Sequence, residues 1–214
     1  KTPPTGPVFL SFPWDTMDET ADVVIAPSSP GYFRIRPDTD AIARASQLLA
    51  GAENPVIVVG DRVAQSGAVP QMVRVAEQLG APVYSVFVGE VNFPTSHSLY
   101  GGALNLNNPA TRQNFAGADV VLAVGANVFN SFLYVPDPFL DPASKLIHMD
   151  SSAAEVERIY ATEVGILADP AAGLEELAEA LEQDMSAQAR EAAATRAATL
   201  AEARRKSKER YRQR

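Results

Sequence analysis

The chain has 214 residues, of which 46% are hydrophobic, 21% charged and 7% aromatic, a balance that indicates a folded protein with a sizeable core. Eighteen Lys and Arg residues against 26 Asp and Glu residues leave a formal net charge of -8, which argues against nucleic acid or an anionic membrane surface as the main partner. No Cys is present, which excludes disulfides, thiolate zinc sites and cysteine nucleophiles and is compatible with the cytoplasmic location that we expect.

The first segment of the chain does not follow the pattern of the rest. Its start lacks both an initiator Met and the basic-then-apolar pattern of a signal peptide, so we expect a piece of a longer chain. The apolar run at residues 8–12 predicts a strand, and Pro27, Pro30 and Pro37 are typical of a linker. We interpret residues 1–37 as the end of a preceding domain and a linker.

Between residues 38 and 184, short apolar runs alternate with amphipathic helical periods. The runs are rich in β-branched residues and apolar throughout, which is typical of strands covered on both faces. This alternation predicts right-handed βαβ crossovers and an α/β fold with a doubly wound, mostly parallel, Rossmann-like sheet in three α/β/α layers. The expected strands are 55–60, 82–86, 119–125, 145–150 and 164–169, and the expected helices are 40–49, 69–79, 109–115, 153–160 and 171–181.

Residues at the expected helix ends agree with this pattern. Asp38 or Thr39 can accept hydrogen bonds from the free amides of the first helix, and Ser151 or Ser152 can do so for the helix after the fourth strand. Gly80 can end the second helix in a left-handed conformation.

The last segment, 185–214, predicts a basic helix. From Arg190 onward, nine Lys and Arg residues stand against three Glu residues. The segment is rich in Ala and has few large apolar residues, so we expect a polar helix that buries no face of its own. The favoured interpretation is a solvated linker helix that leads to a further domain, and the alternative is a basic arm for an acidic partner.

The residues after each strand are the candidates for ligand binding, because ligands of doubly wound sheets bind at the carboxyl ends of the strands. Gly60 and Asp61 open a segment that could bring backbone amides to a phosphate, although we favour a simple turn. Gly125 and Asn127 follow the third expected strand. Asp150 ends the fourth strand, where it could accept a hydrogen bond from a ribose hydroxyl or cap the next helix.

Two further side chains after the third expected strand, Asn130 and Tyr134, could also face a ligand, although Asn residues in loops often serve turn geometry. The chain has only two His residues. His148 lies inside an apolar strand and is expected to be a core residue. His97 lies in the longest loop, where an imidazole could transfer protons near neutral pH. No carboxylate pair, metal-ligand cluster or Ser/His/Asp spacing stands out beside it.

Several motifs occur in the order found in a known enzyme family. They resemble the end of the pyrimidine-binding domain and the whole central domain of thiamine-diphosphate-dependent enzymes. The Phe-Pro-Thr-x-His loop at 93–97 and the Val-Gly-Ala-x-Val-Phe stretch at 124–129 are most similar to the benzoylformate decarboxylase branch. The motifs, which cover nearly the whole chain, lie at 6–15, 54–60, 66–68, 76–83, 93–97 and 118–125.

The resemblance implies that the chain links two catalytic domains of a decarboxylase or carboligase, a lyase that acts on a 2-oxo acid. His97 matches the loop histidine that relays protons in benzoylformate decarboxylase, in an active site completed in a homodimer or homotetramer. Thiamine diphosphate and Mg²⁺ are expected on the other two domains, because the only Gly-Asp pair here, Gly60-Asp61, is followed by Arg62 and not by the family's second Gly. We expect no metal site in this chain and no activity from it in isolation.

Two alternatives stay open. Some relatives, such as acetolactate synthase, hold FAD on this domain, and oxalyl-CoA decarboxylase holds ADP. Many family members carry a second Asp and a Pro after the fourth strand. The segment 150–153 reads Asp-Ser-Ser-Ala and lacks both, which argues against a bound nucleotide. The other alternative is a free-standing nucleotide-binding module without catalysis. In either case the nucleotide edge would comprise Gly60, Asp61, Gly125, Asn127 and Asp150.

Overall fold

The computed structural model describes residues 7–27, 34–86, 89–130 and 138–212, and the contacts divide the chain into units 1–33 and 34–214. The described part of the first unit forms one short helix, α1 (Trp14–Asp18). The strand expected at 8–12 is wrong, because these residues have no regular structure. A strand needs a neighbour for its backbone hydrogen bonds, and residues 7–27 contain none.

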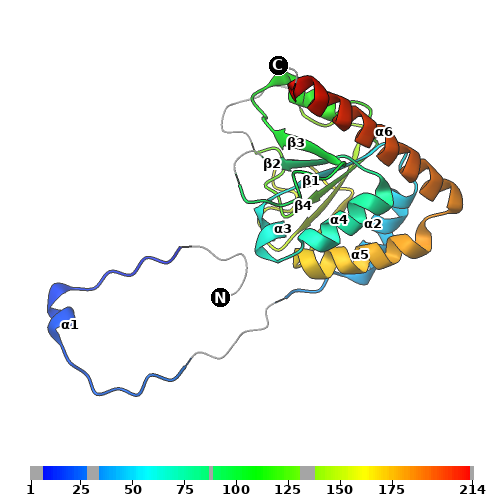
Figure 1. Cartoon of the computed structure of the whole chain (residues 1–214). Helices are drawn as coiled ribbons and strands as arrows, with labels where there is room; N and C mark the ends of the chain where they lie inside the picture. The colour runs from blue at the N-terminus through cyan, green and yellow to red at the C-terminus, as the bar shows by residue number, and fades with distance from the viewer. Residues whose placement is uncertain (1–6, 28–33, 87–88, 131–137, 213–214) are drawn as a thin grey trace. The chain divides into compact units, whose positions relative to one another are not determined.

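The second unit is built on a parallel sheet of six strands in the order β3-β2-β1-β4-β5-β6 (Figure 1). Every pair of neighbours is parallel, so the expected doubly wound α/β fold is confirmed. The strand order reverses between β1 and β4, where Val59 lies beside Val124. The strands are β1 (Pro55–Val59), β2 (Val83–Val86), β3 (Tyr100–Leu104), β4 (Val120–Val124), β5 (Lys145–Asp150) and β6 (Val164–Leu167).

Helices cover one face of this sheet. Alternate residues of β1, Ile57 and Val59, point into a core that also contains Met72, Leu79 and Leu174 from the helices. All five side chains are fully buried. For the three helix residues, this is the burial that the apolar face of an amphipathic helix requires. The helices are α2 (Thr39–Ala50), α3 (Asp61–Gln65), α4 (Val69–Leu79), α5 (Pro170–Asp184) and α6 (Ala187–Arg212).

The described cover of the other face contains no α-helix. Val56 and Val58 of β1 point into a second core with Phe115, Phe129 and Phe139, whose rings contact one another. The helix expected at 109–115 is a 3₁₀ helix, η1 (Pro109–Phe115).

The helix expected at 153–160 does not form. The segment consists of turns in which the amide of Glu155 donates to the Ser152 carbonyl at 3.1 Å, three residues back. Glu157 has φ +60, a left-handed conformation that interrupts any helix. The expected capping role of Ser151 or Ser152 is therefore wrong, because there is no helix to cap.

Strand β3 is not among the strands expected from the sequence, which places His97 and the residues around it in a long loop. Gly101 and Gly102 weaken its strand pattern. The ring of Tyr84 on the neighbouring strand lies where a side chain of Gly101 would be, so this edge strand requires a glycine there.

Two expected helix ends are confirmed. The side chain of Asp38 accepts hydrogen bonds from the amides of Asp40 at 2.9 Å and Ala41 at 3.2 Å. Gly80 ends α4 with φ +58.

The expectation that the basic tail buries no face is wrong. Ala193 of α6 is buried against α4, and Arg196 donates to the carbonyls of Glu53 at 3.2 Å and Leu79 at 2.7 Å. Small alanine side chains let the helix backbone approach closely, which a count of large apolar residues does not reveal. Within the described ranges, no helix combines the length and apolar character needed to cross a bilayer.

Candidate functional site

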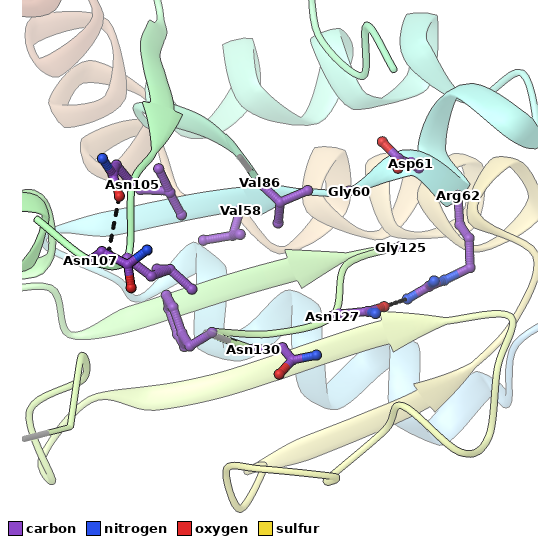
Figure 2. A pocket seen from close by; sticks show the side chains of 13 residues that line it. Val58, Gly60, Asp61, Arg62, Val86, Asn105, Asn107, Gly125, Asn127 and Asn130 are labelled. Carbon is purple, nitrogen blue, oxygen red and sulfur yellow. Dashed lines mark hydrogen bonds between the residues drawn. The ribbon is translucent and has the colours of Figure 1, made fainter. Parts of the chain in front are cut away.

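A pocket of about 550 Å³ lies at the carboxyl edge of the sheet, where the strand order reverses (Figure 2). This is the position at which open α/β sheets bind ligands. It contains four of the expected site residues, Gly60, Asp61, Gly125 and Asn127, and also Asn130. Tyr134 lies outside the described residues. The remaining lining residues are Val58, Arg62, Val86, Leu104, Asn105, Leu106, Asn107 and Phe129.

The backbone of the Gly60 segment does not form a phosphate cradle. The amide of Gly60 donates to Val124 at 3.0 Å and the amide of Arg62 donates to Gly125 at 3.3 Å. The next amide, of Val63, donates back to the Gly60 carbonyl at 3.0 Å. A side chain on Gly60 would collide with the Gly125 carbonyl, so the glycine serves the close approach of two strand ends.

Asp61 is engaged by a neighbouring loop. Its Oδ1 accepts hydrogen bonds from the amide of Glu90 at 2.7 Å and from the side-chain amide of Asn92 at 3.0 Å. These bonds hold the segment after β2 against α3. The described residues contain no group of three or more His, Asp or Glu side chains that could hold a metal ion. Asp61 and the residues around it therefore do not fit a site for the diphosphate group of thiamine diphosphate or for the Mg²⁺ ion that accompanies it.

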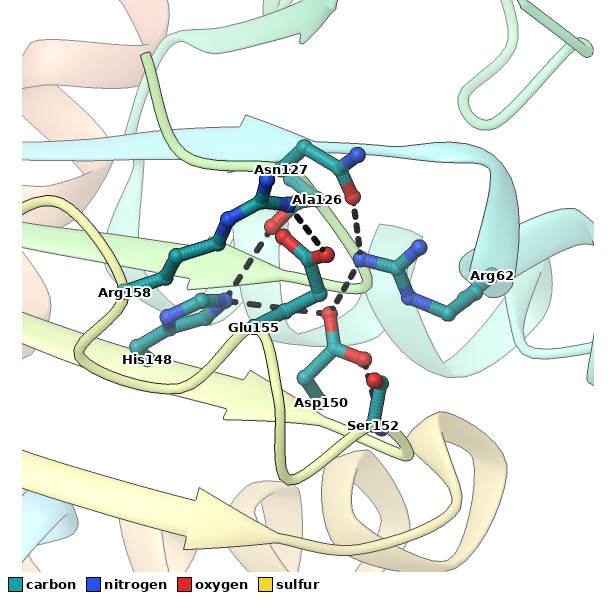
Figure 3. A network of polar contacts seen from close by, with 8 residues as sticks. All are labelled: Arg62, Ala126, Asn127, His148, Asp150, Ser152, Glu155 and Arg158. Atoms are coloured by element: carbon teal, nitrogen blue, oxygen red, sulfur yellow. Dashed lines mark hydrogen bonds and ion pairs between the residues drawn. The ribbon is translucent and has the colours of Figure 1, made fainter. Parts of the chain in front are cut away.

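Arg62 joins the pocket to a buried polar network (Figure 3). Its Nη2 donates to Oδ2 of Asp150 at 2.7 Å and to Oδ1 of Asn127 at 2.8 Å. The Asp150 side chain is 0% exposed, and its Oδ1 accepts from the Ser152 amide at 2.8 Å. A ribose hydroxyl could reach this carboxylate only by displacing Arg62.

The pKa of Asp150 is lowered by its partners. Burial alone would raise the pKa, but contacts with His148 and Arg62 outweigh it and keep the pKa below its usual 3.8. The carboxylate is therefore charged at neutral pH and attracts the guanidinium group of Arg62.

His148 is a satisfied core histidine, as expected. The side chain is buried, and its Nε2 lies 3.1 Å from the Ala126 carbonyl and 3.7 Å from Oδ2 of Asp150. Both neighbours are acceptors, so Nε2 carries a proton.

His97 lies apart from this pocket. Its loop meets the sheet at the opposite edge, where the carbonyl of Leu99 accepts from the amide of Val83 at the start of β2. The imidazole is 19% exposed and lies 3.2 Å from a carboxylate oxygen of Glu77 on α4. The structure thus brings four expected residues into one pocket, attaches Asp150 through Arg62, and leaves His97 separate.

Arg62, Leu104 and Asn105 are among the contributors to these sites that were missed from the sequence. Arg62 comes shortly after the end of β1, and Asp150 ends β5 at the same edge of the sheet. A cation and an acid at one edge could therefore have predicted this ion pair. Leu104 and Asn105 follow a strand that the sequence did not reveal.

Comparison with known proteins finds a matching family model and relatives with similar sequences. The family model described as thiamine pyrophosphate enzyme, central domain, matches residues 42–177. The chain is 33% identical over 172 residues to a sulfoacetaldehyde acetyltransferase of Rhodobacter capsulatus, covering 78% of this chain and 29% of that protein. It is 30% identical over 168 residues to an acetolactate synthase large subunit of Corynebacterium glutamicum, covering 77% and 27%.

A solved structure shares the fold. Benzoylformate decarboxylase of Polynucleobacter necessarius matches with a TM-score of 0.73 and 26% identity, over 84% of this chain and 34% of that one. The chain spans less than a third of the length of the two curated relatives.

Proposed function

The chain belongs to the thiamine pyrophosphate enzyme family as a central domain, and from this premise we propose that it links the catalytic domains of a decarboxylase or carboligase acting on a 2-oxo acid. Relatives named for acetyl transfer, acetolactate synthesis and benzoylformate decarboxylation support this class. In the proposal, thiamine diphosphate and Mg²⁺ are held by parts of a homodimeric or homotetrameric enzyme outside this chain, where the cofactor would supply the electron sink for decarboxylation.

The contribution of this chain to the chemistry is His97. The observation that carries this proposal is a partly exposed imidazole whose Nδ1 lies within hydrogen-bond distance of the Leu99 amide. The amide of Leu99 donates to Nδ1 at 3.2 Å, so Nδ1 has no proton in the neutral ring and Nε2 has one. A histidine held in this state near neutral pH is suited to proton transfer.

The experiment measures decarboxylation of benzoylformate and of pyruvate by the full-length enzyme with thiamine diphosphate and Mg²⁺. We expect His97→Ala to lower turnover by ~100-fold, the scale of losing a proton-transfer group. Ser98→Ala, an exposed change in the same loop, serves as the control and leaves turnover unchanged. Equal turnover in wild type and His97→Ala would mean that this chain acts only as a scaffold.

A second candidate function is the binding of FAD or ADP. The observation that favours it is the pocket of about 550 Å³ at the reversal of strand order. The engaged amides of Gly60 and Arg62 and the Arg62–Asp150 ion pair oppose it. Equilibrium dialysis of the chain with FAD and with ADP discriminates between the two functions. Saturable binding that Asn127→Ala weakens would favour the nucleotide, and no retention would favour the linking domain.

A further inference from the structure

We propose that the pocket at the carboxyl edge of the sheet binds an uncharged aromatic ring that carries a carboxamide group, and that it rejects anionic ligands. This site goes beyond the proposed function, because it depends neither on His97 nor on the thiamine diphosphate held outside this chain. A volume of about 550 Å³ lies within the range of small-molecule pockets and leaves room for two fused aromatic rings.

One part of the pocket is apolar (Figure 2). Leu104 and Phe129 are buried, and the Phe129 ring contacts the Phe115 ring of the second core. This surroundings favours a flat apolar ligand, because an aromatic ring gains free energy from burial against apolar and aromatic side chains. The apolar side chains of the lining are Val58, Val86, Leu104, Leu106 and Phe129.

The polar part of the lining offers hydrogen-bond donors from asparagine side chains. Oδ1 of Asn127 accepts from Arg62 at 2.8 Å, and Oδ1 of Asn105 accepts from the backbone amide of Asn107 at 3.1 Å. Because these oxygens are engaged, the NH2 groups of Asn105 and Asn127 are the atoms left to meet a ligand. A carbonyl oxygen on the ligand can accept a hydrogen bond from either of them.

Asp61 offers an acceptor in the same lining. Its Oδ1 accepts from the Glu90 amide and the Asn92 side chain, whereas Oδ2 takes part in none of the hydrogen bonds formed by the described residues. A carboxamide presents a carbonyl oxygen for an asparagine donor and an NH2 group for this carboxylate. A ketone or an ester has the carbonyl oxygen but lacks the donor.

The charge of the pocket opposes anions. Of the described residues that line it, only Asp61 and Arg62 are charged. The guanidinium charge of Arg62 is balanced by the buried Asp150 at 2.7 Å, so the carboxylate of Asp61 remains as an unbalanced negative charge. A second anion in this partly enclosed space would be repelled, because water screens it less there than in bulk. A phosphate or a carboxylate is therefore a poorer ligand than its neutral analogue.

The test compares 2-naphthamide with 2-naphthoate, which share one ring system and differ in charge at neutral pH. Binding to the 214-residue chain is followed at pH 7 by NMR of the side-chain NH2 groups of Asn105 and Asn127. We expect the amide to bind at least tenfold more tightly than the carboxylate, with the largest shifts at the lining residues. Leu106→Trp, which places a larger ring in the pocket, is expected to abolish binding.

Asp61→Asn tests the charge itself. The change keeps an Oδ1 acceptor for Glu90 and Asn92 and removes the negative charge. We expect about tenfold tighter binding of 2-naphthoate and weaker binding of 2-naphthamide, whose NH2 group loses its acceptor. Asp141→Asn is the matched control, because Oδ1 of Asp141 also accepts from a backbone amide, that of Ala143 at 2.8 Å, and Asp141 does not line the pocket. This control leaves both affinities unchanged.

Four results would overturn the inference: no binding of either compound, equal or tighter binding of 2-naphthoate to the wild-type chain, an unaltered preference in Asp61→Asn, or displacement of 2-naphthamide by ADP. The last of these would instead support a nucleotide in this pocket. None of the four concerns turnover of the full-length enzyme, so failure of this inference and failure of the proposed function are distinguishable.

Discussion

Arg62 at the start of α3 holds the buried carboxylate of Asp150 at the end of β5, with 2.7 Å between Nη2 and Oδ2. The pair connects two strand ends on either side of β4, because α3 directly follows β1. The Arg62 side chain is only 17% exposed, so water replaces it poorly as a partner of the carboxylate. The pair therefore stabilises the carboxyl edge of the sheet.

Replacement of Arg62 by Met is expected to destabilise the chain by about 3 kcal/mol, because it leaves a buried carboxylate without its cation. The measurement is urea unfolding at pH 7, with the stability change taken from the midpoint at constant m. Arg44→Met is the matched control, since its pair with Glu163 has side chains 52% and 38% exposed. A surface pair of this kind contributes at most about 1 kcal/mol. Equal losses in both variants would contradict a stabilising role of the Arg62–Asp150 pair.

Asp150 also predicts an acid-dependent loss of stability. Its pKa in the folded chain is below the usual 3.8, so the unfolded chain binds the proton at a higher pH than the folded chain does. The stability that the charged group contributes is thus complete above pH 3.8 and is lost as the pH falls through the folded pKa. We expect the difference in unfolding free energy between wild type and Asp150→Asn to be constant from pH 7 to pH 5 and to shrink below about pH 4. A difference that grows as the solution is acidified would have the wrong sign for this mechanism.

The contact between α6 and the end of α4 depends on the missing side chain of Gly80. A Cβ there would collide with the Ala193 carbonyl, and φ +58 already disfavours other residues. We expect Gly80→Ala to lose about 3 kcal/mol from the two effects together. Gly117→Ala isolates the backbone effect, because Gly117 has φ +75 but no atom within 4 Å of its Cβ position. This control loses about 1 kcal/mol. The two variants are compared by thermal unfolding. Similar losses of stability would show that a Cβ at position 80 does not collide with α6.

Most of the sheet could be predicted from the sequence because its central strands are apolar on both faces. The run Val56-Ile57-Val58-Val59, for instance, supplies residues to both cores. The missed strand β3 carries Gly101, whose small size accommodates the Tyr84 ring, and Gly102, which has φ +117, and both glycines weaken the strand pattern. The helical period at 153–160 was misleading, because Glu157 adopts a left-handed conformation that the apolar pattern does not reveal.

The candidate site was predictable only as far as topology determines it. Gly60 and Gly125 end neighbouring parallel strands, so they meet at one edge in any doubly wound sheet. The partners of charged side chains follow from packing between distant segments. Arg62 is 88 residues from Asp150, and Glu77 is 20 residues from His97. No spacing rule relates the residues of either pair.

The last prediction concerns Arg204, which attaches the basic helix α6 to the loop of His97. Its guanidinium group donates to the carbonyls of Thr95 and Tyr100. We expect Arg204→Met to increase amide hydrogen exchange in residues 93–104 at least tenfold, because those carbonyls lose their partner and local opening becomes easier. Arg205→Met is the matched control, since Arg205 pairs only with Glu202 and Glu209 of its own helix in the contacts described.

Exchange at β1 and β4 separates local from global effects in the same experiment. These central strands report the unfolding of the whole chain, and they are expected to exchange at the wild-type rate in both variants. Faster exchange confined to the loop in Arg204→Met, and absent in Arg205→Met, would mean that the position of α6 controls how firmly the imidazole of His97 is held. Unchanged exchange in the loop would instead mean that α6 does not control how firmly the imidazole is held, and that contacts such as those with Phe93 and the Leu99 amide are sufficient.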